Sequence, residues 1–273
     1  IRDYYASRGL GDVYKRQVID KEGLEKIGGK NCLKFPYFPV LIKIIDAYDN
    51  LSIQVHPDDE YARRVENEFG KTEIWYVLDA TDDAKLIYGF KNKITKDEFR
   101  KSIEDNTLLD KLNVVNVKKG DLFFIEAGTV HAIGKGALIA EIQQNSNCTY
   151  RVYDYGRVGK DGKPRELHID KAVDVSNTIP PKYDIKPMGD EIESNGNISQ
   201  LLTKCDLFTV DRYQITSGIT LTADEDSFNH ILVTDGNGEI DGKPAKKGDS
   251  YFVPAGYGDY TVKGNIEIIV TRV

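Results

Sequence analysis

The sequence predicts an all-β protein with a few short helices, built from two related units. Runs of β-branched and aromatic residues alternate with Gly, Asn and Asp turn signals along most of the 273 residues. Helical spacing of apolar residues is confined to short stretches. GDLFFIEAGTVHAI (120–133) aligns without gaps with GDSYFVPAGYGDYT (248–261), with five identities in fourteen positions. This repeat indicates two units of similar build, each closed or double-sheeted to protect its strand edges.

The first seventeen residues are set apart from the fold. IRDYYASRGLGDVYKRQ (1–17) has no initiator Met, no secretory apolar core and no hydrophobic period. The segment resembles translated sequencing-adapter sequence. The alternative interpretation is a natural disordered arm. We therefore expect the native sequence to begin near Val18.

Composition excludes several classes of protein. The net charge of −7 argues against a nucleic-acid binder, which usually presents a basic face. No apolar run approaches the ~18 residues that indicate a membrane span. Three widely spaced cysteines, Cys32, Cys148 and Cys205, form neither a disulfide framework nor a thiolate zinc site. A reducing, cytoplasmic setting is expected, and the sequence does not define an oligomeric state.

The first unit is expected to contain seven strands and three helices. Pro57 suits the first turn of a helix that runs from Asp58 towards Gly70. Thr95 and Glu98 form a capping box that opens a second helix. The expected strands are 38–48, 51–56, 73–80, 84–90, 121–127, 137–144 and 149–155, and the other helices are 95–112 and 166–175.

The second unit follows a polar segment rich in Pro and Gly. Residues 177–197 are expected to form a connecting segment. In the repeat, Asp259 occupies the position of His131, so a site in the first unit would be lost in the second. Strands are expected at 207–216, 230–236, 248–255 and 266–272.

Four polar side chains are candidate metal ligands. Gln54 and His56 lie two apart on one strand and therefore share a face. Glu73 begins a strand, and His131 is expected in the loop that follows another strand. Nitrogen and oxygen ligands of this kind suit a borderline divalent ion such as Zn²⁺. Residue types alone nevertheless favour hydrogen-bonded structural histidines over metal ligands.

Two further charged residues are candidates for catalysis or substrate binding. Glu141 lies among apolar neighbours on a strand, where burial would raise its pKa towards that of a useful base. It is equally suited to orienting His131. Lys71, two residues before Glu73, suits an anionic substrate, and a solvated turn lysine is an equally good interpretation.

The motifs QVHPDDEYA, GKTEIWYVLDA, EAGTVHAIGKGALIAEIQQNSNCTYRVYDYGR and RELHIDKAVDV together resemble the short bacterial type I mannose-6-phosphate isomerases. The resemblance is dense over about residues 35–176 and looser in the second unit. It implies two cupin-type (jelly-roll) β-barrels with one Zn²⁺ in the first. It also implies a catalytic role for Arg151 in TYRVYD. The ligands implied are Gln54, His56, Glu73 and His131.

The resemblance divides the chain into a zinc-binding catalytic cupin domain at 18–176, a connecting segment at 177–197 and a degenerate cupin-like domain at 198–273. The catalytic domain is expected to lack the N-terminal strands with which family members begin.

The implied reaction interconverts mannose 6-phosphate and fructose 6-phosphate through an enediolate. Zinc would polarise the sugar oxygens as a Lewis acid. Arg151, always cationic, suits enediolate stabilisation or phosphate contact better than proton abstraction. The alternatives are another cupin metal enzyme, such as an Fe(II) dioxygenase, and a sugar-phosphate-binding cupin without catalysis.

Overall fold

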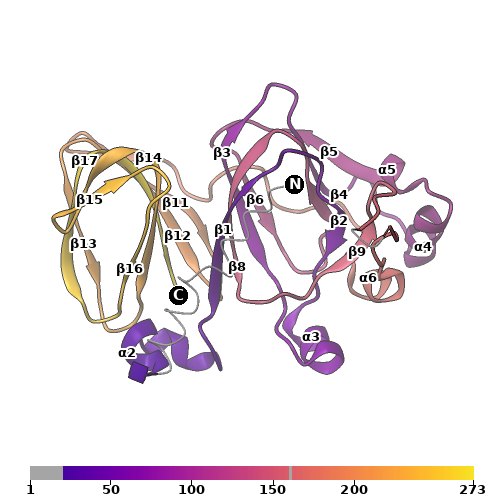
Figure 1. Ribbon diagram of the computed structural model, residues 1–273, viewed down its shortest axis with the longest axis horizontal. Helices are drawn as coiled ribbons and strands as arrows, with labels where there is room; N and C mark the ends of the chain where they lie inside the picture. Colours follow the sequence, from indigo (N-terminus) through magenta and orange to yellow (C-terminus); the bar gives the residue numbers. More distant parts are fainter. Residues whose placement is uncertain (1–20, 160–161) are drawn as a thin grey trace. The chain divides into compact units, whose positions relative to one another are not determined.

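The computed structural model describes residues 21–159 and 162–273 (Figure 1). The segment expected to be non-native, residues 1–17, lies outside the described residues. The chain divides into two compact units. Unit 1 is Leu41–Ile185, and the described part of unit 2 is residues 21–40 together with Lys186–Val273.

Unit 1 is built from two sheets. One sheet contains β1 (Val40–Asp46), β3 (Glu73–Ala80), β6 (Leu122–Ile125) and β8 (Ala137–Gln144). The other contains β2 (Ile53–Val55), β4 (Lys85–Phe90), β5 (Leu112–Asn116), β7 (His131–Ile133) and β9 (Tyr150–Tyr153). Their strand orders are β1-β8-β3-β6 and β5-β4-β7-β2-β9.

The two sheets of unit 1 share an apolar core. Trp75 and Phe123 from the four-stranded sheet belong to the same buried cluster as Leu86, Tyr88 and Ile133 from the five-stranded sheet. Successive side chains of a strand point to opposite faces, so each strand contributes alternate residues to this cluster. The sheets therefore pack face to face, and the inward side chains of β3 and β8 lie between them.

Helices cover the other face of the five-stranded sheet. Phe99 and Ala172, from two of the helices, lie in one buried cluster with Val55 of β2 and Val152 of β9. This cluster closes the core on the side away from the four-stranded sheet. The helices of unit 1 are α3 (Asp59–Glu66), α4 (Lys96–Glu104), α5 (Leu108–Lys111) and α6 (Ile169–Val175).

The structure confirms the starts of the first two predicted helices better than their ends, whereas the third, predicted over 166–175, begins at Ile169 and ends at Val175. The Glu98 backbone N–H donates to the Thr95 hydroxyl, and the Thr95 N–H donates to the Glu98 carboxylate, which completes the capping box. The prediction of one helix over 95–112 is wrong. Asn106 adopts a left-handed φ of 58° that ends the first helix, and the chain then forms α5 and β5. Likewise, α3 ends at the left-handed Asn67 rather than near Gly70.

Unit 2 contains a single eight-stranded sheet and two short helices. The strand order is β10-β11-β12-β17-β14-β15, with β13 also paired to β17 and β16 to β14. The segment expected only to connect the units, 177–197, thus includes a strand. The elements are α2 (Leu24–Gly28), the 3₁₀ helix η2 (Lys30–Lys34), β10 (Ile192–Ser194), β11 (Asn197–Lys204), β12 (Thr209–Ile215), β13 (Ile219–Ala223), β14 (Asn229–Ile240), β15 (Lys243–Lys246), β16 (Ser250–Val253) and β17 (Gly258–Arg272).

Backbone hydrogen bonds join the segment around α2 and η2 to the rest of unit 2. The N–H groups of Lys30 and Asn31 donate to the carbonyls of Glu225 and Asp226 at 3.1 and 2.9 Å. Between the two helices, Gly29 has a φ of 88°, and a Cβ there would lie 2.5 Å from the Asp226 carbonyl oxygen. Only glycine fits this close approach, so residues 28–31 pack directly against the backbone at Asp226.

The prediction of a mostly β protein with a few short helices is confirmed. Closed jelly-roll barrels were also expected, but the pairings of the described strands close no barrel. Instead, unit 1 protects its strands by packing two sheets together.

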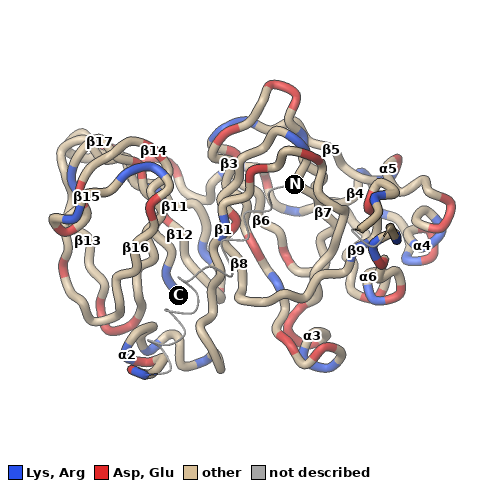
Figure 2. The backbone as a smooth tube through the Cα atoms, in the orientation of Figure 1, with Lys and Arg blue, Asp and Glu red and all other residues tan. Residues whose placement is uncertain are grey.

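The surface and the cysteines have ordinary features. Lys and Arg are interspersed with Asp and Glu along the backbone of both units (Figure 2). Within residues 21–159 and 162–273, no helix has the length and apolar character needed to cross a membrane. Cys32, Cys148 and Cys205 are free thiols, the first two buried.

Candidate metal centre

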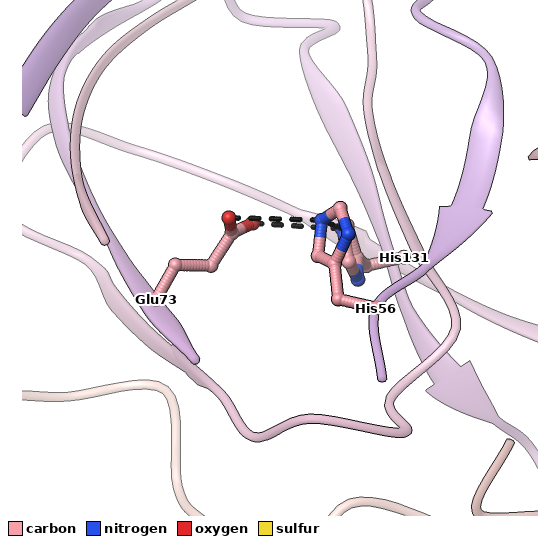
Figure 3. A group of neighbouring side chains, drawn as sticks. All are labelled: His56, Glu73 and His131. Atoms are coloured by element: carbon pink, nitrogen blue, oxygen red, sulfur yellow. Dashed lines mark hydrogen bonds and ion pairs between the residues drawn. The ribbon is translucent and has the colours of Figure 1, made fainter. Parts of the chain in front are cut away.

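Three buried side chains converge where strands of the two sheets of unit 1 meet. His56 follows β2, Glu73 begins β3 and His131 begins β7. The His56 and His131 Nε2 atoms are 3.1 Å apart, and Glu73 oxygens lie 3.7 Å from the first and 3.5 Å from the second. Figure 3 shows the carboxylate pointing at both rings. Three ligand atoms, one from each residue, thus fall within 4.8 Å of one another.

Strand pairing explains how residues distant in sequence meet here. Gln54 of β2 is paired with His131 on one side and Arg151 of β9 on the other. The strand status of His131 corrects the expectation that it lies in a loop, because β7 is held between β2 and β4. Cross-strand neighbours share a face of the sheet, so the pairing aligns Arg151, Gln54 and His131 side by side.

Backbone carbonyls orient both imidazoles. His56 Nδ1 lies 2.8 Å from the Cys148 carbonyl, and His131 Nδ1 lies 2.7 Å from the Thr129 carbonyl. Because a carbonyl only accepts, each Nδ1 carries the proton and each Nε2 presents a lone pair to the cluster. This is the second contact that metal-binding histidines usually make.

The charge environment keeps both imidazoles neutral. Burial lowers the pKa of His56 well below its usual value, and the Lys71 ammonium lowers it further. Burial, with the same ammonium, lowers the pKa of His131 to about 3. Neutral imidazoles are the form that binds a metal.

The donor set fits a cation better than an internal hydrogen-bond network. Two imidazole lone pairs face each other at 3.1 Å, with no proton of their own to share. Glu73 Oε1 is buried and has no hydrogen-bond donor. Burial and then the nearby Glu141 raise the pKa of the Glu73 carboxyl, although the Lys71 ammonium opposes them, so its charged form depends on neighbouring positive charge. A divalent ion would satisfy all three ligands at once.

Gln54 reaches the cluster through its amide. Its amide nitrogen lies 3.5 Å from His131 Nε2. The amide oxygen and nitrogen are nearly indistinguishable in shape, and exchanging them would direct the oxygen at the cluster. The structure therefore brings together His56, Glu73 and His131, with Gln54 beside them.

A second polar group, formed by two lysines and a carboxylate, adjoins the cluster. Lys71 Nζ contacts the Glu73 carboxylate and lies 3.0 Å from His56 Nε2 and 3.9 Å from Glu141 Oε1. Lys43 Nζ lies 2.8 Å from the same Glu141 oxygen. Although burial alone would raise the pKa of Glu141, the two ammonium groups outweigh it and lower that pKa. The prediction that burial raises the pKa of Glu141 is therefore wrong, and Glu141 is held as a carboxylate.

Lys43 was not among the residues selected from the sequence. It lies between two isoleucines in the strand VLIKIID, and only 17% of its side chain is exposed. A buried charge in such a strand needs a partner, which is the signal that could have identified it. Arg151 is paired with Gln54 and therefore lies on the same face of the sheet. Its guanidinium donates to the Glu166 carbonyl at 3.0 Å.

Unit 2 has different residues at the equivalent positions. Pairing of β14 with β16 places Asn229 where pairing of β3 with β6 places Glu73, because the repeats align at the partner positions. The Asn229 amide donates to the Tyr260 hydroxyl at 3.0 Å, and Asp259 replaces His131. Within the described parts of the chain, the one His, Cys, Asp and Glu group suited to a metal is that of unit 1.

Comparison with known proteins identifies the family of the chain. Residues 6–88 match the model of the type I phosphomannose isomerase catalytic domain, and residues 197–273 match the cupin domain of mannose-6-phosphate isomerase. The chain is 43% identical to mannose-6-phosphate isomerase ManA of Bacillus subtilis over 242 residues, covering 86% of this chain and 75% of that protein. It is 37% identical to the mannose-6-phosphate isomerase of Streptococcus mutans over 269 residues, covering 95% and 82%.

A solved structure gives the same result. The crystal structure of mannose 6-phosphate isomerase from Bacillus subtilis superposes with a TM-score of 0.83 at 35% identity, covering 94% of this chain and 81% of that one. Sequence and fold therefore agree over nearly the whole chain. The chain belongs to the type I mannose-6-phosphate isomerase family.

Proposed function

We propose that the protein is a zinc-dependent aldose–ketose isomerase that interconverts mannose 6-phosphate and fructose 6-phosphate. The observation that carries the proposal is the buried His56–Glu73–His131 cluster beside the lysine–carboxylate group. Two imidazoles and a carboxylate, with the Gln54 amide, are the ligand types that Zn²⁺ takes in catalytic sites. One ion per chain is expected, since unit 2 has Asn229 and Asp259 where unit 1 has Glu73 and His131.

The bound zinc would polarise the sugar oxygens and stabilise negative charge on them. In the open-chain aldose, a base removes the proton on C2 while the C1 oxygen is protonated, which gives an enediol through its enediolate. Delivery of a proton to C1 and loss of the proton from the C2 hydroxyl then give the ketose. Atoms balance without an oxidant, so the chemistry requires only proton transfer and charge stabilisation.

We assign the proton transfer to Glu141. It is buried and ionised, so it can accept a proton at neutral pH. Its two lysine neighbours reduce its basicity while no substrate is bound. An anionic substrate that draws the Lys71 ammonium towards itself would raise the proton affinity of Glu141 at the moment it is needed.

Arg151 and Lys71 are assigned to the anionic parts of the substrate. Arg151 lies on the strand face of Gln54, next to the zinc ligands, and its permanent charge suits the enediolate or the phosphate. Lys71 presents a buried ammonium at the centre of the site. Both residues would therefore affect substrate binding and turnover without themselves moving the carbon-bound proton.

The rest of the organisation follows from this assignment. Of the expected catalytic cupin domain, 18–176, residues 41–176 lie in unit 1, where the two packed sheets would be the halves of a jelly roll, and residues 21–40 lie in unit 2. Residues 177–197 would connect it to a degenerate cupin-like domain at 198–273. The free thiols agree with the reducing cytoplasmic setting that we propose.

The test is identification of the product. Purified protein is incubated with mannose 6-phosphate, and fructose 6-phosphate is quantified by NMR before and after chelation and zinc restoration. Formation that stops on chelation and returns with zinc supports the proposal. Iron with oxygen consumption and no ketose would indicate a dioxygenase. Sugar-phosphate binding without turnover, unchanged in Arg151→Ala, would indicate a binding protein.

A further inference from the structure

The single tryptophan of the chain lies between the metal cluster and Glu141. Trp75 is 1% exposed, and its indole N–H donates to Glu141 Oε2 at 3.2 Å. Its ring and the His131 ring meet edge to face, with centroids 5.1 Å apart and planes at 83°. One rigid side chain thus contacts a proposed zinc ligand and the proposed base.

The strand pairing makes this contact a fixed feature of the sheet. Trp75 of β3 is directly opposite Glu141 of β8. Trp75 also shares its strand face with Glu73, two residues earlier. Its ring packs against Phe123 of β6, with centroids 6.5 Å apart. The donor therefore has little freedom to leave its acceptor.

The two oxygens of Glu141 have different partners. Oε1 faces the ammonium groups of Lys43 at 2.8 Å and Lys71 at 3.9 Å. Oε2 receives the neutral indole N–H. Without that donor, the carboxylate plane would be free to turn about the Cγ–Cδ bond, because only the oxygen facing the lysines would keep a partner. The indole contact thus fixes the plane of the carboxylate, with one oxygen at the lysines and the other at the indole.

We infer that Trp75 is a positioning residue for the isomerisation, whose indole N–H holds the Glu141 carboxylate in one orientation. This inference rests on the proposed function, since it gives Trp75 a role through the proposed base. With the carboxylate plane fixed, one oxygen stays directed at the lysines, and Lys71 remains shared between Glu73 and Glu141. A tryptophan is suited to this task because it has one donor and no acceptor.

The kinetic test is Trp75→Phe, which keeps an aromatic ring and removes the N–H. The expected result is a kcat lower by about 10- to 100-fold, with KM within about twofold and zinc content unchanged. Phe123→Leu is the matched control, because it disturbs the packing of the same ring without touching Glu141. It should lower the melting temperature and retain most of kcat. An unchanged kcat in active Trp75→Phe protein overturns the inference.

A second measurement does not depend on activity. The single indole N–H gives one resonance in a ¹H–¹⁵N spectrum of the full chain, and a charged acceptor displaces it downfield. Glu141→Gln should shift this resonance upfield, and an unmoved resonance overturns the contact. If the unaltered chain forms no fructose 6-phosphate, the proposed function fails and the kinetic role fails with it. The resonance still reports separately whether the indole and the carboxylate are bonded.

Discussion

Lys71 places a positive charge inside the proposed zinc site, and its removal should tighten zinc binding while weakening catalysis. The ammonium contacts Glu73 and lies 3.0 Å from His56 Nε2, so it competes for two of the ligands. Lys71→Met keeps most of the side-chain volume and removes the charge. The two effects of opposite sign distinguish this change from general damage to the fold.

The size of the effect follows from the dimensions of the cluster. Lys71 Nζ lies 3.0 Å from His56 Nε2 and contacts Glu73, so an ion bound by these ligands would lie within about 5 Å of the ammonium. A single and a double positive charge about 5 Å apart repel by about 1.7 kcal/mol at the dielectric constant of water and by about 7 kcal/mol at an effective value of 20. The lower figure already corresponds to more than about tenfold in affinity. The Lys71→Met variant should therefore bind Zn²⁺ at least about tenfold more tightly.

The assay is a competition titration. Protein stripped of metal is titrated with Zn²⁺ against a chelating indicator of known affinity, and the fluorescence of Trp75 gives an independent signal beside His131. Lys43→Met is the matched control, because the Lys43 ammonium pairs with Glu141 and Gln143 rather than with the ligands. Its gain in zinc affinity should be smaller.

The kinetic consequence is the reverse. With the buried ammonium removed, the KM for mannose 6-phosphate should rise about tenfold or more, because a charged partner of the substrate is lost. Zinc affinity in Lys71→Met that equals or falls below that of the unaltered chain would refute the reasoning about the site.

Three further predictions concern the ligands, unit 2 and a buried thiol. His131→Ala should lose zinc on desalting and lose isomerase turnover together, since a buried ligand is removed; full zinc content by mass spectrometry would exclude His131 as a ligand. Asp259→Ala, at an exposed position, should keep kcat and change the free energy of unfolding by less than about 0.5 kcal/mol; a large loss of turnover would place chemistry in unit 2. Burial raises the pKa of the Cys32 thiol from 9.0 to about 12, so the folded chain retains a proton that the unfolded chain releases. This stabilisation is complete below pH 9 and is lost above it by up to about 1.4 kcal/mol per pH unit. Denaturant unfolding between about pH 8 and about pH 10.5 should show that extra slope relative to Cys32→Ala, and equal slopes would contradict it.

Much of unit 1 could be predicted because its strands are long and apolar. The predicted bounds of β3 and β8 match the structure, since both are buried over most of their length. Several strands of unit 2 were not predicted because they bury few of their side chains. β15, KPAK, has a single buried residue, so local sequence carries little strand signal and its pairing with β14 determines its conformation.

The site shows the same division between local and long-range information. His56, Glu73 and His131 stand in motifs that the sequence displays, and the fold brings them together. The roles of Lys43 and Trp75 depend on strand register, which places each beside Glu141 from about 65 to 100 positions away. No local pattern encodes such a pairing, so the partner of Lys43 and the role of Trp75 emerged only from the structure.

The most direct test of the central claim is a zinc titration of activity. Metal-free protein receives increasing Zn²⁺, and the initial rate of conversion of mannose 6-phosphate to fructose 6-phosphate is plotted against the ratio of zinc to chain. Activity should be absent without metal, rise linearly and reach its plateau at one zinc ion per chain. Full isomerase activity in the metal-free protein, or a plateau that appears only with iron, would contradict a zinc site at His56, Glu73 and His131.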